Sequence, residues 1–554
     1  VDKFVGEIDR SVTLGDRKNM LYMGSSVAYG RAKAVVCATG MSTEMGKIAN
    51  ILDSAKEEKT PLQRKMAQLS KILTFAVIGI SLFIFAFNLI KNGFGVKSVM
   101  NSLFIAIGLA VASIPEGLAT VVTIVLSIGV TNMSRKNAVI RRLTAVETLG
   151  SCQIICSDKT GTLTQNVMTV TETYGDDTAL LAKAMALCSD ATLTDNKAVG
   201  EPTECALVNY ALTQNVNKAE AETATPRIAE LPFDSERKMM STFHKTDNGV
   251  TQYTKGAPDV VLANCKYALI DGKTVTIDER LHKKILDVNK QMADKALRVL
   301  AAAFVKYDEL PEELTTQARE KHMTFIGLCG MIDPVRPEVK SAIDECKNAG
   351  IRPIMITGDH IDTAVAIATE LGIITDSSQA IVGAALNEMD DEQLAKVIEK
   401  YSVYARVQPE HKVRIVNAWK GLGKVCAMTG DGVNDAPSIK SADIGVGMGI
   451  TGTDVTKQTA DMILTDDNFA TIVTAVKEGR RIYDNIRKAI QFLLSSNLAE
   501  VLSVFIATVC GFTLLKPAHL LWINLITDTF PAVALGMEQA ETDVMFRLPR
   551  DKTD

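Results

Sequence analysis

Several patterns that mark metal-binding and secreted proteins are absent from this sequence of 554 residues. Its ten cysteines include no C-x-x-C pair and no Cys/His set with metal-ligand spacing, and its six histidines form no H-E-x-x-H. These absences argue against a zinc site and favour reduced thiols in a cytosolic setting. The first residues, V-D-K-F-V-G-E, lack the basic and apolar regions of a signal peptide. They also do not resemble the start of a protein, so we expect a cut N-terminus.

An excess of charge of one sign is also missing. The chain has 60 Lys and Arg against 65 Asp and Glu, a net charge of −5, and no nucleic-acid-binding motif, so a nucleic-acid partner is not expected. Hydrophobic residues make up 47% and charged residues 23%. The mean hydropathy of +0.12 is high for a soluble enzyme and suggests membrane helices diluted by polar domains. The length allows roughly three or four domains.

Two long stretches are nearly free of charge. No charged residue lies between Lys71 and Lys91, a length close to the roughly 20 residues that cross a bilayer. Between Lys97 and Arg135 the one charged residue is Glu116. A buried soluble helix can be this apolar, but rarely over such a length. A second apolar block covers residues 492–512 and 520–537, so we predict membrane helices in both blocks.

Basic clusters follow the first block and precede the second. By the positive-inside rule these ends face the cytosol, which places the polar insertion between them, from about residue 143 to 484, on the cytosolic side. The clustered residues are Arg135, Lys136, Arg141, Arg142, Arg480, Arg481, Arg487 and Lys488.

The two ends of this insertion have an α/β pattern. Short apolar strands are predicted at residues 153–156, 352–356 and 425–428, each followed by an aspartate-containing turn and a helical pattern. Parallel strands whose carboxyl ends carry aspartates form one acidic, phosphate-handling pocket. Residues 167–327 have their own patterning and are predicted to form an inserted domain.

The first of these turns carries residues suited to phosphoryl chemistry, in the string C-S-D-K-T-G-T-L-T-Q-N at 156–166. Asp158 is the predicted nucleophile, and Lys159 can neutralise phosphoryl charge. Thr160 offers a hydroxyl and a carbonyl to a metal or phosphate, and Gly161 permits close approach of the backbone. The tripeptide D-K-T alone would fit an ordinary surface turn.

A second aspartate-rich turn, T-G-D-G-V-N-D, covers residues 429–435. Asp431 can join Asp158 and the Thr160 carbonyl in holding Mg²⁺, which prefers oxygen ligands. Asn434 and Asp435 complete the acidic rim. Lys412, in P-E-H-K, can reach the phosphate as a compact positive charge.

Acidic residues within the apolar blocks suggest an ion path, because charge at membrane depth is costly. Helical spacing places Asn497 with Glu500 on one face, and Asn524 with Thr527 and Asp528 on another. Pro115 cannot donate a backbone hydrogen bond, so the helix carrying Glu116 should open there and release carbonyl oxygens. Such oxygen ligands indicate a hard cation, although polar residues can also simply join helices. The carbonyls are those of Val111, Ala112 and Ile114.

The string around Asp158 resembles the phosphorylation loop of the P-type cation-transporting ATPases, and the order of segments along the chain is similar to that family's. The resemblance implies a multi-domain fold: an α-helical membrane bundle, a cytosolic α/β haloacid-dehalogenase-like phosphorylation domain, an inserted α+β nucleotide-binding domain and a partial β actuator domain. The implied segments are the partial actuator domain (1–55), a linker with membrane helices three and four (56–135), the phosphorylation domain (136–166 and 328–480), the nucleotide-binding domain (167–327), membrane helices five and six (481–540) and the start of a following loop (541–554).

The resemblance also implies functional residues. Adenine stacking is assigned to Phe233, and ATP contacts to Glu204, Lys238, Lys255, Gly256 and Arg298. Thr357, Gly358 and Asp359, in T-G-D-H, are assigned to the phosphorylation and nucleotide sites. Haloacid-dehalogenase-like phosphatases usually carry a second aspartate two positions after the nucleophile, where this chain has Thr160. Losing that acid and base should prolong the life of an aspartyl phosphate, which suits a pump.

The transported ion is expected to be Ca²⁺. N-L-I-T-D at 524–528 resembles the N-L-x-T-D of sarcoplasmic-reticulum-type calcium pumps, where sodium/potassium pumps carry D-L-G-T-D. M-E-Q-A-E at 537–541 resembles the sodium/potassium branch, so a pump of that type, or for another cation, is the alternative. The family implies proton counter-transport. A membrane-tethered phosphatase is an alternative from a different class, against which Thr160 and the intramembrane acids argue.

Parts of the family pattern are not found. The T-G-E-S loop, whose glutamate positions the hydrolytic water, should precede V-D-K, and four further helices should follow the chain, so the remaining parts of the same pump are expected partners. The compact nucleotide-binding domain favours a bacterial homologue in the plasma membrane.

Overall fold

The computed structural model describes residues 3–8, 17–25, 27, 30–46, 61–112, 117–194, 197–512 and 514–551. The chain divides into two compact units. The first unit contains Val1–Lys159, Glu338–Gly358 and Leu371–Asp554, and the second contains Thr160–Pro337 and Asp359–Glu370.

A largely parallel sheet organises the polar part of the first unit. Among the described residues it has eight strands in the order β1-β18-β17-β16-β2-β13-β15-β14, and only the β1–β18 pair is antiparallel. The strand bounds are β1 (Ala138–Ile140), β2 (Ile154–Asp158), β13 (Arg352–Ile356), β14 (Ala380–Val382), β15 (Val403–Ala405), β16 (Cys426–Gly430), β17 (Ile444–Met448) and β18 (Met462–Leu464).

The central strands are apolar because helices cover the sheet. Ile154, Cys156, Ile354 and Met428 are buried in one cluster with Trp419 of helix α16, as expected for parallel strands inside an α/β fold. The helices of this part are α5 (Leu143–Gly150), α12 (Pro337–Asn348), α14 (Gly383–Asn387), α15 (Asp391–Val397), α16 (Pro409–Gly421), α17 (Ala436–Ser441) and α18 (Asp454–Thr459).

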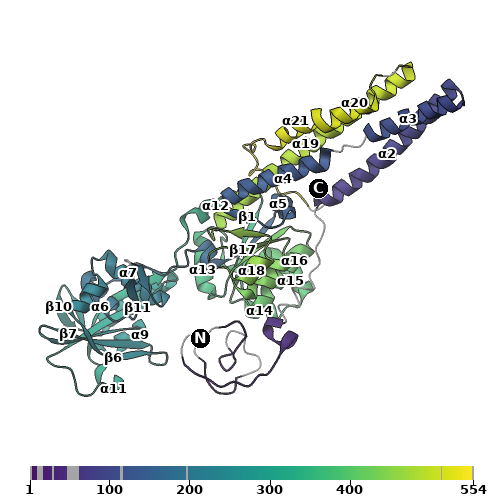
Figure 1. The fold of residues 1–554 in the computed structure, drawn as a ribbon. Coiled ribbons are helices and arrows are strands. Elements are labelled where there is room, and N and C mark those ends of the chain that lie inside the picture. The colour runs from purple at the N-terminus through teal and green to yellow at the C-terminus, as the bar shows by residue number, and fades with distance from the viewer. Residues whose placement is uncertain are drawn as a thin grey trace. The chain divides into compact units, whose positions relative to one another are not determined.

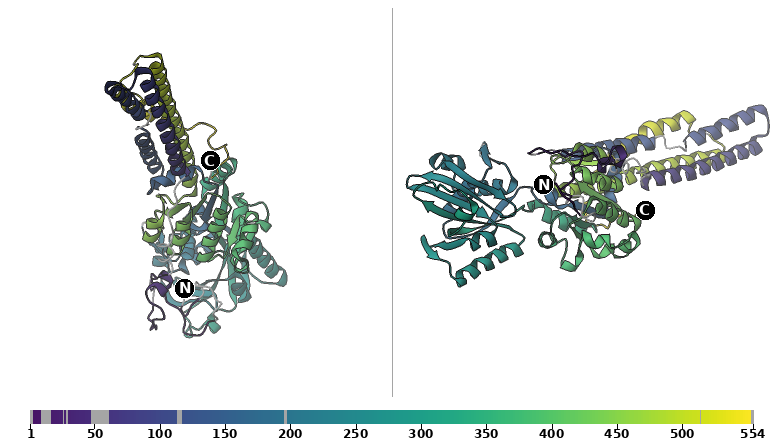
Figure 2. Two further views of the ribbon diagram at one scale, coloured as in Figure 1. Left: turned by 90° about the vertical axis from the view of Figure 1, so that its right-hand side faces the viewer. Right: turned by 90° about the horizontal axis from the view of Figure 1, so that it is seen from below.

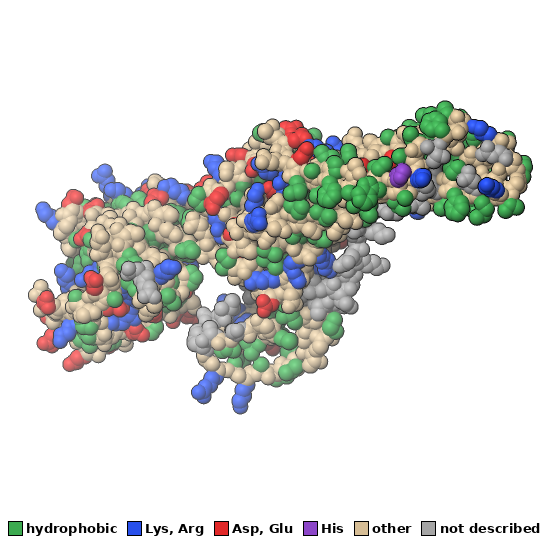
Figure 3. Space-filling model, turned by 45° about the horizontal axis from the view of Figure 1, so that its top comes forward, with side chains coloured by type: hydrophobic (Ala, Val, Ile, Leu, Met, Phe, Trp, Pro, Cys, Tyr) green, Lys and Arg blue, Asp and Glu red, His purple; other side chains and the backbone are tan. Residues whose placement is uncertain are grey.

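The first unit also contains the apolar helices. They are α2 (Pro61–Asn92), α3 (Val96–Ala112), α4 (Gly117–Arg135), α19 (Phe469–Cys510), α20 (Pro517–Trp522) and α21 (Thr529–Gly536). Four spans are long and apolar enough to cross a membrane: Thr74–Lys91, Gly117–Arg135, Phe469–Cys510 and Ala518–Gly536. Helices α4, α19 and α21 pack side by side (Figure 1). On the face shown in Figure 3, hydrophobic side chains cover much of the surface of these helices, as expected of a surface that faces lipid.

The second unit is built on a mostly antiparallel sheet (Figure 2). Its strand order is β10-β9-β12-β11-β8-β7-β6, and β3 also pairs with β12. Strands β4 and β5 pair antiparallel with each other in a separate two-stranded sheet. The bounds are β3 (Thr169–Tyr174), β4 (Thr192–Thr194), β5 (Lys197–Val199), β6 (Arg227–Asp234), β7 (Met239–Thr246), β8 (Gly249–Gly256), β9 (Cys265–Ile270), β10 (Lys273–Thr276), β11 (Arg298–Tyr307) and β12 (Met323–Ile332).

Helices cover both faces of this sheet. Met240 and Ala302 face a cluster with Leu181 of α6, whereas their neighbours Met239 and Ala301 face a second cluster with Ile285 of α10. This alternation follows from the two-residue period of a strand. The covering helices are α6 (Thr178–Leu187), α7 (Pro202–Thr213), α8 (Lys218–Ala224), α9 (Pro258–Ala263) and α10 (Glu279–Asp294). The second unit also contains α11 (Thr316–Arg319) and α13 (Ile361–Glu370).

Two details differ from the sequence-based expectations. Strand β12 runs to Ile332, beyond the expected boundary at residue 327, because its pairing with β3 continues to that residue. The partial actuator domain expected at residues 1–55 is a β domain, but the described residues of that segment, 3–8, 17–25, 27 and 30–46, form no strand. A strand is stable only when a neighbouring strand satisfies its backbone hydrogen bonds, and no strand among the described residues pairs with these.

Candidate phosphorylation, nucleotide and ion sites

Asp158 ends the central strand of the parallel sheet, between β13 and β16. Lys412, on α16, donates to Oδ2 of Asp158 at 2.6 Å and to Oδ1 of Asp435 at 2.7 Å. Burial disfavours the charged ammonium, but the charges of Asp158 and Asp435 outweigh burial and raise the pKa of Lys412 well above its usual value. The positively charged ammonium group of Lys412 is therefore held beside Asp158, the predicted nucleophile.

Asp431 and Asp435 follow the neighbouring strand β16. Backbone N–H groups of Asp431 and Gly432 donate to Oδ2 of Asp435 at 3.3 and 3.2 Å. Gly430 is required here, because a Cβ atom at that position would lie 2.4 Å from the Cβ of Asp435. Burial, followed by the charges of Asp435 and Asp158, raises the pKa of Asp431. The structure thus brings Asp158, Lys412, Asp431 and Asp435 together.

The residues present fit a magnesium ion. One ammonium group, that of Lys412, faces the carboxylates of Asp158, Asp431 and Asp435, so the site retains negative charge. No group of three His, Cys, Asp or Glu side chains able to hold an ion by themselves occurs among the described residues. Mg²⁺ commonly binds through one or two carboxylates together with substrate phosphates, which is the arrangement that this carboxylate set can provide.

Thr429 lies in β16 and Thr357 directly follows β13, and these two strands flank Asp158. The Oγ1 atom of Thr429 accepts from the backbone N–H of Asp158 at 3.0 Å. Thr357 follows Ile356, the register partner of Asp158, and its N–H donates to the carbonyl of Tyr404 at 2.9 Å. Of the other predicted residues in the first unit, Lys159 is buried and Asn434 is exposed.

Thr160 begins the second unit, and two residues that the P-type resemblance singles out without giving them a role hold the loop after it. Asp333 accepts from Oγ1 of Thr164 at 2.5 Å, and Arg336 donates to the carbonyl oxygens of Gly161 and Thr164 at 2.9 and 3.1 Å. Their signal in the sequence is D-P-V-R-P at 333–337. Asp359 and the helix after it belong to the second unit as well.

The residues assigned to the nucleotide gather at one end of the second unit's sheet. The register pairs Asp234 with Met239, Met239 with Gly256, and Gly256 with Ala301. This end therefore carries Phe233 on β6, Lys238 in the turn between β6 and β7, Lys255 and Gly256 on β8, and Arg298 on β11.

The chemistry of this end is mixed apolar and cationic. Phe233 is 62% exposed, so an aromatic face is free to stack. A Cβ on Gly256 would lie 2.5 Å from the carbonyl oxygen of Lys238, so only glycine fits beside that strand. Arg298 donates to Oγ1 of Thr203 at 2.9 Å, which ties it to the start of α7.

Glu204, near the start of α7, pairs with Lys255. Their side chains are hydrogen-bonded, and Lys255 also donates to Oγ of Ser189 at 3.0 Å. Glu204 further accepts from the backbone N–H groups of Asp190 and Ala191 at 2.7 and 3.0 Å. These hydrogen bonds occupy the carboxylate of Glu204. We therefore expect Glu204 to hold the side chain of Lys255 in place.

Buried polar residues mark the apolar helices. Glu500 and Asn497 are buried on α19, and Asp528 and Asn524 are buried around the π-helix η7 (Ile523–Thr527). Among the residues that the structure describes, both carboxylate oxygens of Glu500 and Oδ2 of Asp528 have no hydrogen-bond partner. Buried carboxylates without partners are costly, and a bound cation would remove that cost.

The other predicted ion ligands are either exposed or lie wholly or partly outside the described residues. Thr527 is exposed, because the π-helical turn changes which residues share a face with Asn524. Ile114 and Glu116 lie outside the described residues, as do the side chains of Val111 and Ala112. The next described residue, Gly117, is close to Thr529: a Cβ there would lie 2.8 Å from its Oγ1.

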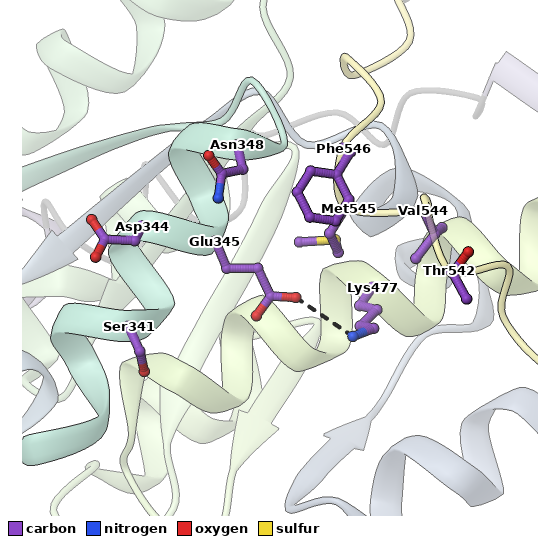
Figure 4. Close-up of a pocket in the computed structure, with 9 residues that line it drawn as sticks. All are labelled: Ser341, Asp344, Glu345, Asn348, Lys477, Thr542, Val544, Met545 and Phe546. Carbon is purple, nitrogen blue, oxygen red and sulfur yellow. Dashed lines mark ion pairs between the residues drawn. The ribbon is translucent and has the colours of Figure 1, made fainter.

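A pocket of about 320 Å³ lies away from all of these residues (Figure 4). It is lined by residues of α12, by Lys477 of α19, by Thr542 and by residues 544–546. Glu345 and Lys477 form an ion pair of 3.6 Å across it. None of the predicted site residues lines it.

Three family models match the chain. The P-type ATPase actuator domain matches residues 3–53, the cytoplasmic domain N of P-type ATPases matches residues 177–338, and the C-terminus of cation-transporting ATPases matches residues 512–554.

Curated relatives match almost the whole chain. It is 49% identical to calcium-transporting ATPase 1 of Bacillus cereus, covering 98% of this chain and 62% of the relative. It is 45% identical to calcium-transporting ATPase 1 of Lactococcus lactis, with coverages of 99% and 65%. For calcium-transporting ATPase type 2C member 1 of Bos taurus, identity is 38% and the coverages are 98% and 59%. The chain thus spans about three fifths of the length of these relatives.

These matches confirm the resemblance on which the sequence-based interpretation rests. The chain belongs to the P-type cation-transporting ATPases.

Proposed function

We propose that this chain supplies the phosphorylation, nucleotide-binding and ion-binding parts of a pump that moves Ca²⁺ out of the cytosol at the expense of ATP. The observation that carries the proposal is the position of Lys412, which contacts both Asp158 and Asp435 at the carboxyl end of the sheet. The relatives named as calcium-transporting ATPases support the choice of ion.

In the proposed reaction a carboxylate oxygen of Asp158 attacks the γ-phosphorus of ATP. A bond forms between that oxygen and phosphorus, the bond from phosphorus to the bridging oxygen breaks, and ADP leaves with the bonding electron pair. Lys412 offsets negative charge on the transferred group. Lys159 and Thr160 would contact the same group, and Thr357, Gly358 and Asp359 would help to bind the nucleotide. When bound, Mg²⁺ supplies charge neutralisation for the phosphates, and Asp158, Asp431 and the carbonyl of Thr160 would hold it, with Asn434 and Asp435 at the rim.

ATP would bind at the end of the second unit's sheet that carries Phe233 and Lys255. The exposed ring of Phe233 would stack on adenine, while Lys238, Lys255 and Arg298 would contact the phosphates. Gly256 would leave room for close approach, and Glu204 would contact the nucleotide or position Lys255.

Calcium would bind among the oxygen atoms of the apolar helices. Glu500 and Asp528 are buried, and three of their carboxylate oxygens have no hydrogen-bond partner among the described residues, which leaves them available to a cation. Asn497, Asn524 and Thr527, together with Glu116 and the carbonyls of Val111, Ala112 and Ile114, would complete an oxygen-only ligand set suited to Ca²⁺.

After Ca²⁺ leaves, the carboxylates of Glu500 and Asp528 would take up protons, so protons would return as counter-ions. The membrane would be the plasma membrane, as expected for a bacterial homologue with a compact nucleotide-binding domain. The polar insertion would lie in the cytosol, because basic residues flank the apolar blocks where they meet that insertion.

The test measures phosphorylation of the protein by ATP that carries a radiolabel in its γ-phosphate. We expect an acid-stable, hydroxylamine-sensitive phosphoenzyme that requires micromolar Ca²⁺ and Asp158. Glu500→Gln and Asp528→Asn should shift the calcium requirement, whereas the control Thr123→Val, at an exposed position of α4 outside the ligand set, should leave it unchanged. Labelling that requires Na⁺ and ignores Ca²⁺ would overturn the choice of ion. Phosphate release unaffected by Asp528→Asn would favour a tethered phosphatase.

A further inference from the structure

The turn between β6 and β7 in the second unit carries Phe233 at its start and Lys238 at its end. All residues from 232 to 238 are exposed except Arg237, whose side chain is only 17% exposed. Arg237 is therefore the one side chain in this turn that reaches the interior of the unit.

Arg237 is held there by a buried carboxylate. Its guanidinium donates to Oε1 of Glu320, a residue that is 3% exposed and directly follows α11. The same guanidinium donates to the backbone carbonyl of Pro232 at 2.5 Å. Arg237 thus connects Glu320 to the residue immediately before Phe233.

The carboxylate of Glu320 is itself fixed from the side of the sheet. Ser241 donates to its Oε1 at 2.7 Å, and Ser241 is within 2.8 Å of Thr254. Gln252 donates to Thr254 at 3.0 Å and to the carbonyl of Arg319 at 3.2 Å. These buried bonds restrict Glu320 to one position.

The turn needs such support because its backbone is strained. Lys238 has a positive φ of 55°, a conformation that costs roughly 1–2 kcal/mol for a residue with a side chain. The carbonyl of Lys238 accepts from the N–H of Ala257, next to Gly256, at 3.0 Å. A change in the turn would therefore move Phe233 and Lys238 and also alter the backbone beside Gly256.

We propose that Glu320 is a positioning residue for the nucleotide: through Arg237 it holds the turn so that Phe233 and Lys238 face the adenine and phosphates of ATP. The inference rests on the proposed function, in which this end of the sheet binds ATP. A buried ion pair is weak as a source of stability, since an apolar pair of similar volume can be equally stable. The value of the pair would lie in fixing the direction of the turn.

The test uses the whole chain in membranes with four variants: Glu320→Gln, Arg237→Met, the double variant, and Glu172→Gln. Glu172→Gln is the control, because it breaks another ion pair of the second unit, that of Glu172 with Lys295, without touching Glu320 or the turn. We expect Glu320→Gln and Arg237→Met each to weaken ATP binding about 10-fold. The double variant should be no weaker than the stronger single variant, because both act through one link. Glu172→Gln should remain within about twofold of wild type.

Hydrogen exchange is a second readout, which still tests the inference if a variant no longer binds ATP measurably. Hydrogen exchange of the amides at residues 236–238 should speed up in Glu320→Gln and Arg237→Met, with exchange in the core strand β8 unchanged. Unchanged ATP affinity in both single variants, or additive losses in the double variant, would overturn the inference. A wild-type chain that binds no ATP would instead overturn the proposed function.

Discussion

The ammonium group of Lys412 lies 2.6 Å from Oδ2 of Asp158, although the two residues are 254 positions apart in the sequence. The pair forms because α16 begins at Pro409, close to the carboxyl end of the sheet where β2 delivers Asp158. A second bond to Asp435 fixes the direction of the lysine side chain.

Replacing Lys412 should therefore cost more than removing a surface charge. In Lys412→Gln, the charges of Asp158, Asp431 and Asp435 lose their cation, and the transferred phosphoryl group loses its neutralising partner. We expect phosphorylation by ATP to slow by about 100-fold or more, as measured by rapid-quench labelling.

The matched control for this variant is Lys420→Gln. Lys420 lies on the same helix, but it pairs with Asp443 and the carbonyl of Ser441. Its replacement should leave the labelling rate within about threefold of wild type. Equal rates in the two variants would show that Lys412 does not act on the phosphoryl group.

The hydroxyl of Thr429 should be needed to hold the nucleophile. It is fully buried and accepts from the amide of Asp158 at 3.0 Å. In Thr429→Val the amide would lose its acceptor, which costs about 1–3 kcal/mol. We expect slower phosphorylation and a lower melting temperature, and Thr429→Ser, which keeps the hydroxyl, should restore both. A serine variant as impaired as the valine variant would point to packing instead.

Asp467 offers a prediction about the magnesium site. Its buried carboxylate accepts from the backbone N–H groups of Gly449, Ile450 and Thr451. The loop that it holds continues to Thr453, whose N–H donates to the carbonyl of Asp431 at 2.8 Å.

The Asp467→Asn substitution should weaken the hydrogen bonds that hold this loop, and the looser loop should displace Asp431. We expect the Mg²⁺ concentration for half-maximal phosphorylation to rise about 3–10-fold. Asp454→Asn, which removes the same charge from an exposed position in the same region, is the control. If both variants need the same Mg²⁺ concentration as wild type, Asp467 is only a support for the loop.

The contrast between Asp158 and Asp467 shows how far sequence reasoning reaches. Strand β13 spans Arg352–Ile356, the range predicted from its apolar run, because a buried parallel strand has a local and continuous pattern. Asp158 is found through the string around it. Asp467 and Glu320 have no such string: each acts by accepting hydrogen bonds from residues 16–83 positions away, and such contacts exist only once the chain has folded.

The membrane part shows the same limit in a different way. Helical spacing predicts Asn524, Thr527 and Asp528 on one face, but the structure buries Asn524 and Asp528 and leaves Thr527 exposed. The cause is the π-helical turn, which has no signature in the spacing of the residues.

His244 should make the stability of the second unit depend on pH. The fully buried ring contacts the carbonyl of Thr225 through Nδ1 at 3.0 Å and the hydroxyl of Thr242 through Nε2 at 2.9 Å. Since the carbonyl can only accept, Nδ1 carries the proton and Nε2 accepts from Thr242. Burial lowers the pKa of His244 in the folded chain.

The direction of the pH effect follows from that pKa. Above the unfolded pKa of about 6.5 the ring is neutral in both states, so His244 imposes no penalty. As the pH falls below that value, the unfolded chain takes up a proton more readily than the folded chain, and stability is lost. We expect hydrogen exchange in β7 to accelerate between about pH 7 and 5.5 in excess of the intrinsic change. His244→Gln can form both hydrogen bonds without titrating, so it should abolish that excess; an equal excess in the variant would assign the effect to another group.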